Sequence, residues 1–291
     1  MNNLVQNYEI ILKRLHAHNL PENFHLQRRK PKLSDLELVA LALTAEYMSI
    51  DSELQLFRVM QGSSLEGRIE RTVYNKRRRY LKPFMEHIQR TVAKSMSLSD
   101  VYIVDSRPVK ICKMSRAGRS SICATEDIRP AFGWISSTKR HYFGYKLHAV
   151  CDSNGIIHSF DFTPANVHDI KYLQDVKHDI SDCILLGDKG YLSAAYQTDL
   201  FTASNITLSV PMRHNQHNYH SYSKSARRYR KRIETLFSQL ECQFMMARNF
   251  AKTLWGLYAR VLSKITAITV IQNINIKELN NKINNLKVNL C

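Results

Sequence analysis

Two short apolar runs in this chain each end in an aspartate. The first covers residues 101–105 (VYIVD) and the second covers residues 183–188 (CILLGD). Both are rich in residues typical of buried strands, so we expect each strand to lead its carboxylate to the edge of a sheet. Because burying an unpaired carboxylate costs several kcal/mol, Asp105 and Asp188 are expected to have partners or to bind a metal ion. Either acid alone can also be a turn former or a helix cap.

The segments around these runs predict a sheet covered by helices. Strands are expected over 142–151 and 156–162, and Asn154 with Gly155 between them is a two-residue hairpin signal. The remaining apolar periodicity predicts helices over 167–176, 193–203 and 227–248 and a last strand over 206–210. This order predicts an α/β fold with a mixed five-stranded sheet flanked by helices, which resembles the RNase H-like arrangement. The basic stretch 110–140 has few apolar residues and is expected to be an irregular loop.

The first hundred residues have the apolar spacing of helices. Ser34 and Glu37 have the spacing of a capping box immediately before an apolar run. A later helical segment, 68–92, contains four consecutive cations: Lys76, Arg77, Arg78 and Arg79. Such a run is either a solvated basic face or the DNA-contacting helix of a helix-turn-helix-like module. We therefore predict an all-α DNA-binding region over residues 1–98, with these four cations as candidate DNA contacts.

The charge balance favours a polyanionic partner. Lys and Arg number 42 against 25 Asp and Glu, so the 291 residues carry a formal net charge of +17. Nucleic acid is the commonest polyanionic partner of a soluble protein. A basic protein that binds DNA only non-specifically, or one associated with the ribosome, is the alternative.

The sequence shows no sign of export or of a membrane. The N-terminus lacks the order of a secretory signal, and the most apolar stretch, 254–276, is interrupted by charged and amide side chains. Six cysteines without any CxxC pair argue against a structural zinc site and favour reduced thiols. We therefore expect a cytoplasmic protein that is associated with the nucleoid when it binds DNA.

A third acid, Glu234, follows a dense basic run. Residues 224–232 contain six cations, and one of them, Arg230, lies four positions before Glu234 on the same helical face. The pair could simply stabilise the helix, but the excess of cations favours a phosphate contact by Arg230. Glutamates are common in helices, so Glu234 is a candidate catalytic residue only in combination with the two aspartates.

Together, Asp105, Asp188 and Glu234 are the predicted catalytic and metal-binding acids. If the strands ending at the two aspartates are neighbours, their carboxylates face each other, and the helix with Glu234 packs across the same edge. Three converging carboxylates repel one another without a cation, and hard oxygen ligands select Mg²⁺ or Mn²⁺. Two such ions about 3.5–4 Å apart activate an attacking oxygen and stabilise a leaving oxygen in phosphoryl transfer.

Four segments resemble the DDE transposases of bacterial insertion sequences. They are VYIVDSRPV around Asp105, FGYKLHAVCDSNGIIHSFDFTPANVHD, ILLGDKGYL around Asp188 and RKRIETLFSQL around Glu234. In detail the match is closest to the IS982 family, within the wider IS4/IS5-like group, and it covers most of the chain. The motifs come in the order of that family, and their combination is specific although each one alone is weak.

The resemblance implies an RNase H-like DDE catalytic domain, which we place at 99–250 with the basic loop 110–140, followed by a C-terminal helix and tail at 251–291. It also implies Mg²⁺ dependence, binding to the terminal inverted repeats of an element, and strand cleavage followed by strand transfer. Dimerisation is expected because two element ends must be brought together, so a homodimer on DNA is predicted.

Arg230 matches the arginine of the wider group's tyrosine-arginine-glutamate-lysine pattern. The chain departs from that pattern at two positions, because Arg227 stands in the place of the tyrosine and Glu241 in the place of the lysine. The candidate DNA contacts of the catalytic region are Lys146, Lys189, Arg227, Arg228 and Arg230.

Two other functions stay open at this stage. One is an RNase H-like nuclease that cuts DNA without joining it. The other is a non-catalytic DNA-binding repressor derived from a transposase, although such a protein has no physical reason to keep three unpaired acids together.

Overall fold

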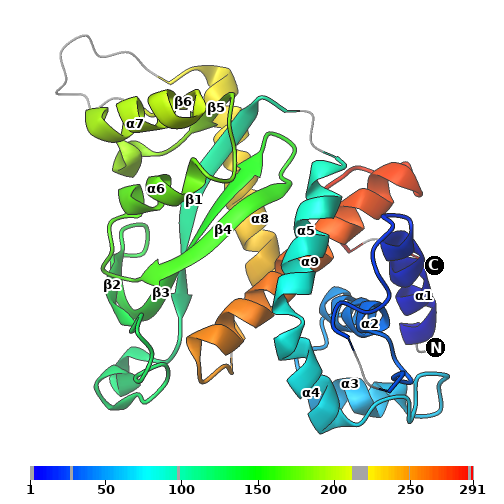
Figure 1. The fold of residues 1–291 in the computed structure, drawn as a ribbon. Coiled ribbons are helices and arrows are strands. Elements are labelled where there is room, and N and C mark those ends of the chain that lie inside the picture. The colour runs from blue at the N-terminus through cyan, green and yellow to red at the C-terminus, as the bar shows by residue number, and fades with distance from the viewer. Residues whose placement is uncertain are drawn as a thin grey trace. The chain divides into compact units, whose positions relative to one another are not determined.

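The computed structural model describes residues 3–26, 29–96, 99–211, 222–248, 250–287 and 290. The chain divides into two units (Figure 1). The helical unit comprises Met1–Met96, Leu240–Arg248 and Trp255–Cys291, and the sheet unit comprises Ser97–Gln239 and Asn249–Leu254. Segments from both ends of the chain therefore share the helical unit, while both aspartate-ending runs lie in the sheet unit.

Helices from both ends of the sequence build the helical unit. They are α1 (Leu4–His16), α2 (Asp35–Tyr47), α3 (Glu53–Met60), α4 (Arg71–Tyr80), α5 (Lys82–Lys94) and α9 (Leu254–Lys277). The predicted capping box is confirmed at the start of α2. Ser34 Oγ accepts the Glu37 amide at 3.1 Å, and the Glu37 carboxylate accepts the Ser34 amide at 2.6 Å. Because α2 is buried on all sides, it is a core helix rather than an amphipathic surface helix.

The C-terminal helix α9 is buried from Val261 to Asn275. Of the described helices, it is the one with the length and composition to cross a membrane, but 67% of its most apolar window is buried in the structure. Its Lys264 forms an ion pair with Glu46 of α2, and both side chains are almost fully buried. Burial and pairing of this kind are expected of a core helix.

One mixed sheet forms the centre of the sheet unit. Its strands are β1 (Val101–Lys110), β2 (Ala131–Ile135), β3 (Arg140–Asp152), β4 (Ile157–Pro164), β5 (Cys183–Leu186) and β6 (Ile206–Ser209). Their order is β2-β3-β1-β5-β6, with β4 paired to β3. β1 pairs antiparallel with β3 and parallel with β5, and β5 pairs parallel with β6. The predicted mixed α/β fold is thus confirmed.

The hairpin predicted at Asn154 and Gly155 joins β3 to β4. Gly155 adopts φ +89°, a conformation that glycine accepts readily. The Asp152 carboxylate accepts the amides of Asn154 and Ile156, both at 2.9 Å, so an aspartate at the end of β3 closes the turn.

Strand β2 corrects two expectations, since the described residues form a six-stranded sheet rather than a five-stranded one, and the stretch 110–140 is not wholly irregular. β2 pairs with the first residues of β3. Gly133 makes this close pairing possible, because a Cβ there would lie 2.6 Å from the ring of Tyr142. The strand is short and depends on its partner, which local sequence does not reveal.

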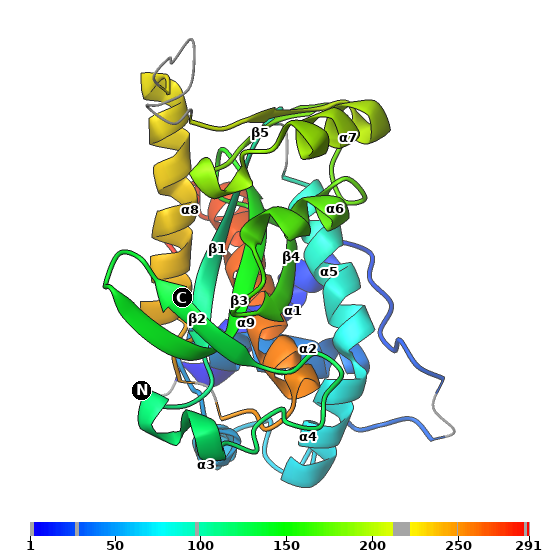
Figure 2. The same cartoon turned by 90° about the vertical axis from the view of Figure 1, so that its left-hand side faces the viewer.

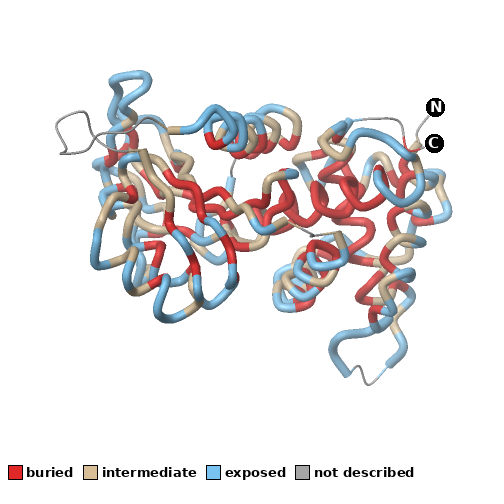
Figure 3. The backbone as a smooth tube through the Cα atoms, turned by 90° about the horizontal axis from the view of Figure 1, so that it is seen from above, coloured by how far each residue is buried: buried red, intermediate tan, exposed pale blue. Residues whose placement is uncertain are grey.

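Helices cover both faces of the sheet. α6 (Leu173–Val176) and α7 (Ala194–Ser204) lie on one face, and α8 (Lys224–Cys242), which belongs to the sheet unit as far as Gln239, lies on the other (Figures 1 and 2). On the first face, Val104 of β1 is buried with Leu173 of α6 and Leu200 of α7. The central strands are accordingly buried while most connecting loops are exposed (Figure 3).

Candidate active site

Asp105 of β1 and Asp188, which lies just beyond the end of β5, occupy corresponding positions relative to two neighbouring parallel strands. The last pair of residues between β1 and β5 is Ile103 with Leu186, and each aspartate lies two positions beyond that pair. Because parallel strands advance in the same direction, this register brings the two carboxylates to the same level of the sheet. The expectation that these strands are neighbours is confirmed.

Backbone amides orient both carboxylates. Asp105 Oδ1 accepts the amide of Ser106 at 2.8 Å, and Asp188 Oδ1 accepts the amide of Gly190 at 2.7 Å. Asp188 caps the short 3₁₀ helix Lys189–Tyr191 in this way. A Cβ at position 190 would lie 2.9 Å from the Asp188 carboxylate oxygen, so a larger residue there would displace this carboxylate.

The pKa of Asp105 is raised to about 6, chiefly because the carboxyl is largely removed from water. The negative charge of Asp188 adds to this increase, and that of Asp169 contributes further. The Ser106 amide and the Arg230 guanidinium act in the opposite direction. Asp105 therefore lies in an environment that opposes its charged form near neutral pH, a property often found in functional carboxyl groups.

Arg230 and Glu234 come from α8, on the face of the sheet that carries Asp105. Arg230 is half-buried, and its positive charge lowers the pKa of Asp105. Glu234 is exposed and follows Arg230 by one helical turn. Within the described ranges, no group of three or more His, Cys, Asp or Glu side chains is placed to hold a metal ion. Asp188 and Arg230 therefore both influence the carboxyl of Asp105, while the place of Glu234 in the catalytic set stays a prediction.

Tyr222, just before α8, supports the loop that carries Asp188. Its hydroxyl donates to the carbonyl of Ser209 at 2.7 Å and lies 3.3 Å from the carbonyl of Gly187. The side chain therefore joins the ends of β5 and β6 directly next to Asp188. Sequence reasoning missed this residue, because nothing in its local pattern distinguishes it from the other tyrosines.

A family model described as the transposase DDE domain matches residues 96–270, which is more than half of the chain. This chain belongs to that family. The matched span includes both aspartates and Glu234. Comparisons with curated proteins and with solved structures found no match. The resemblance to DDE transposases is thereby confirmed, and the mixed sheet with helices on both faces is consistent with their RNase H-like fold. The narrower assignment to the IS982 family stays a prediction.

The donor set of this transposase fits a divalent metal ion. Asp105 and Asp188 offer hard oxygen ligands, and the negative charge of Asp188 adds to the increase that burial causes in the pKa of Asp105. A divalent cation between them would remove that repulsion. DDE transposases generally use such ions.

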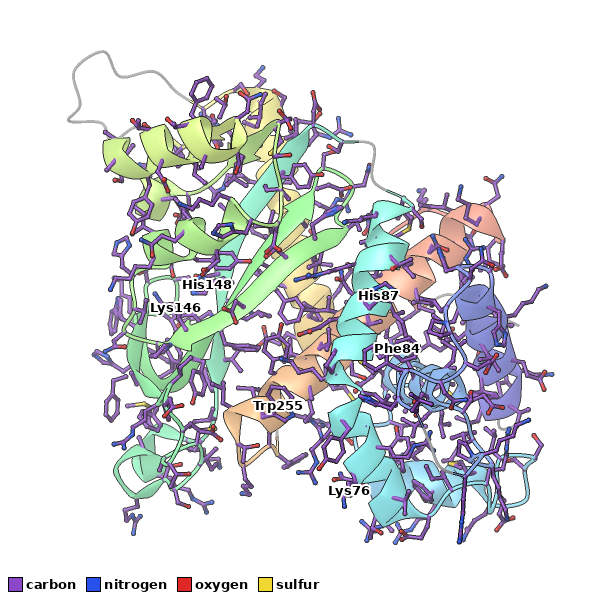
Figure 4. All side chains as sticks on the ribbon, in the orientation of Figure 1. Lys76, Phe84, His87, Lys146, His148 and Trp255 are labelled. Atoms are coloured by element: carbon purple, nitrogen blue, oxygen red, sulfur yellow. The ribbon has the colours of Figure 1, made fainter. Side chains whose placement is uncertain are left out.

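Lys146 and His148 lie on the opposite face of the sheet from Asp105. In the β1–β3 register Asp105 is opposite Ala149, whereas His148 is opposite Ser106, and successive side chains alternate between faces. Both residues are labelled in Figure 4. Lys146 Nζ donates to Asp169 Oδ1 at 2.9 Å and to the Val167 carbonyl at 2.8 Å. Its charge is thus engaged within the sheet unit, and a DNA contact by Lys146 stays a prediction.

Asp169, the first residue of the 3₁₀ helix Asp169–Tyr172, also contacts the strand that carries Asp105. Its Oδ1 accepts the hydroxyl of Ser106 at 3.0 Å in addition to Lys146. Because Ser106 directly follows Asp105, Asp169 steadies the strand beside the candidate catalytic carboxyl. The remaining predicted DNA contacts of this unit, Lys189, Arg227 and Arg228, are all exposed.

Two of the four consecutive cations in the helical unit form ion pairs, and the other two are exposed. Arg77 forms an ion pair with Asp35 at 2.6 Å, and Arg78 forms one with Glu53 at 3.2 Å. Lys76 and Arg79 are exposed on α4. All four residues are predicted DNA contacts, but packing turns Arg77 and Arg78 toward carboxylates of neighbouring helices.

Proposed function

We propose that this transposase binds the terminal inverted repeats of a mobile element and catalyses metal-dependent DNA strand cleavage followed by strand transfer. The observation that carries the proposal is that Asp105 and Asp188 each lie two residues beyond the last residue pair of β1 and β5, where the pKa of Asp105 is raised to about 6. Two carboxylates held together against their mutual repulsion form an arrangement that a divalent cation stabilises. Membership of the transposase DDE domain family supports the same reaction class.

Asp105, Asp188 and Glu234 are the proposed metal-binding and catalytic acids, with two Mg²⁺ or Mn²⁺ ions. When bound, such ions supply activation of the attacking oxygen and stabilisation of the leaving oxygen of a phosphodiester. Asp105 has to be deprotonated to act as a ligand, and the nearby Arg230 favours that form. Glu234 is exposed one turn beyond Arg230 on α8, and we propose that it supplies the third carboxylate when metal ions are bound.

The cations have a proposed role in holding DNA. Arg230 would hold a phosphate beside the carboxylates, because a guanidinium donates two parallel hydrogen bonds to phosphate oxygens. The exposed Lys189, Arg227 and Arg228 would extend this contact along the backbone. The helical region 1–98 is proposed to recognise the inverted repeats. The protein would act in the cytoplasm as a homodimer on two element ends.

Cleavage of a DNA fragment that carries the element end, with Mg²⁺ present, tests the proposal. Asp105→Asn, Asp188→Asn and Glu234→Gln should each abolish cleavage while leaving binding to the end largely intact. Asp175→Asn is the matched control, because Asp175 is exposed on α6 and its replacement removes the same charge. Undiminished cleavage by Asp105→Asn or Asp188→Asn would refute the proposal, whereas undiminished cleavage by Glu234→Gln alone would remove Glu234 from the catalytic set.

Joining needs a separate measurement. A pre-cleaved element end with a free 3′-hydroxyl should be transferred into a second DNA molecule by the wild-type protein. Cleavage without transfer would assign the chain to nucleases that cut but do not join. Binding without either reaction would assign it to repressors.

A further inference from the structure

A pocket in the helical unit combines cationic and aromatic side chains. It has a volume of 620 Å³ and is lined by Lys76, Arg79, Tyr80, Pro83 and Trp255. This volume falls within the range of roughly 300–1,000 Å³ that is usual for small-molecule sites. The lining comes from α4, the start of α5 and the start of α9, and Figure 4 labels Lys76 and Trp255. No residue of the candidate active site contributes to it.

The two aromatic rings of the pocket are exposed, and that of Trp255 is held by a neighbouring cation. Trp255 is 50% exposed and Tyr80 is 64% exposed. Lys82 Nζ lies over the ring of Trp255, 4.2 Å from its centroid, and over the ring of Tyr258, 4.0 Å from its centroid. This cation–π contact fixes the indole while half of its surface remains accessible. Fixed, exposed aromatic rings are the surfaces on which nucleobases stack.

The cationic part of the pocket comes from one face of α4. Lys76 and Arg79 are three residues apart, so they lie next to each other along the helix, and Tyr80 follows on the same side. The Arg79 guanidinium donates to Asn75. Among the residues that the structure describes, neither Lys76 nor Arg79 forms an ion pair with a carboxylate, in contrast to Arg77 and Arg78. Two cations beside two exposed aromatic rings match the phosphate and the base of one nucleotide.

We propose that this pocket binds an unstacked nucleotide of a DNA strand, with the base against Trp255 and Tyr80 and the phosphate on Lys76 and Arg79. This inference rests on the proposed DNA-binding function and adds to it the state of the DNA. In a duplex the faces of a base are covered by its neighbours, so only a base outside the stack can present a face to a side chain. The pocket therefore selects single-stranded or locally opened DNA over intact duplex.

The two tryptophans of the chain allow a direct test with all 291 residues present. Trp134 and Trp255 are the only tryptophans, and they are about equally exposed at 51% and 50%. Trp134→Phe leaves Trp255 as the sole indole fluorophore, and Trp255→Phe leaves Trp134. An oligothymidylate of about 12 nucleotides, within the usual span of single-strand sites, is titrated into each variant. We expect strong quenching of Trp255 and little quenching of Trp134.

Three further arms identify which part of the nucleotide is bound. An abasic strand of the same length keeps the phosphates but should not quench Trp255. Thymidine monophosphate should quench only at much higher concentration, because a single phosphate contributes little binding. Trp255→Ala should weaken strand binding by between about fivefold and about a hundredfold, the range measured for one lost stack. Equal quenching of both tryptophans, equal quenching by the abasic strand, or equal affinity for duplex would overturn the proposal.

The cations are tested on the same oligonucleotide. Lys76→Gln and Arg79→Gln should each weaken binding and reduce the slope of log affinity against log salt by about 0.7. Arg71→Gln is the matched control, because it removes an exposed charge from the same helix without lining the pocket. An Arg71→Gln effect equal to the other two would mean general attraction to charge and would overturn the phosphate assignment.

Failure here is distinguishable from failure of the proposed function. Asp105→Asn should keep the quenching of Trp255 while cleavage is lost, since Asp105 belongs to the sheet unit. If the wild-type protein cleaves DNA but its Trp255 is not quenched, the nucleotide-binding proposal for the pocket is wrong and the proposal for the active site is unaffected.

Discussion

The ammonium of Lys146 lies 2.9 Å from a carboxylate oxygen of Asp169, and that same oxygen accepts the hydroxyl of Ser106. The pair thus connects β3 and the segment after β4 to the residue that follows Asp105. It joins two largely buried charges, with exposed side-chain fractions of 17% and 27%. The contribution of this ion pair to the free energy of unfolding can be measured by mutation.

Asp169→Asn should destabilise the protein more than Lys146→Met. The first change leaves an ammonium without its counter-ion and weakens the acceptor of Ser106, at a cost of about 1–3 kcal/mol in the free energy of unfolding. Urea denaturation of both single variants and of the double variant measures the coupling. Strict additivity of the two changes would show that the pair contributes nothing.

Asp105→Asn should increase stability near neutral pH in the absence of divalent ions. The pKa of Asp105 is raised to about 6 in the folded protein from 3.8, so the folded state binds more protons than the unfolded state between these values. The contribution of Asp105 is therefore most favourable below pH 3.8 and is lost as the pH rises through 6. The variant escapes a penalty of up to about 3 kcal/mol. Urea midpoints at pH 5 and pH 7.5 with a chelator present check this, and a less stable variant at pH 7.5 would contradict it.

His148 should lower the free energy of unfolding as the pH falls, whereas the effect of Asp105 is to lower it as the pH rises. Burial lowers its pKa to about 4 from 6.5, while its Nε2 lies 2.7 Å from Thr163 Oγ1 and its ring stacks on Tyr172. The unfolded chain takes up the proton first as the pH falls, so this contribution is complete above pH 6.5 and is lost toward pH 4. The loss is on the order of 2–3 kcal/mol. His148→Gln should flatten the stability curve in this window relative to wild type, and an unchanged slope would count against a neutral buried imidazole.

Mn²⁺ should stabilise the wild-type protein against urea through the aspartate pair. A ligand that binds only the folded state adds about 2.7 kcal/mol at roughly a hundredfold excess over its Kd. Asp105→Asn and Asp188→Asn should remove this increment, Glu234→Gln should reduce it, and Asp175→Asn should leave it unchanged. An equal increment in all four variants would place the binding of Mn²⁺ elsewhere.

Much of the fold was predictable because its signals are local. The strands that precede Asp105 and Asp188, the capping box of Ser34 and Glu37, and the turn at Gly155 each depend on residues that are close in sequence. The matching positions of the two aspartates also follow from their spacing in the sequence. Asp188 comes 83 positions after Asp105, and the register of β1 with β5 has the same offset, from 103 to 186.

What tertiary structure decided is which polar groups meet. Arg77 and Arg78 are indistinguishable from Lys76 and Arg79 in the sequence, yet only the former two are turned toward Asp35 and Glu53. In the same way, Lys146 meets Asp169, and Arg230 of α8 is close enough to Asp105 for its charge to lower the pKa of that carboxyl. The physical reason is the sequence distance over which each interaction acts. Apolar periodicity and turn chemistry act over a few residues, whereas an ion pair or a shared carboxylate site depends on where distant segments pack, which no local pattern encodes.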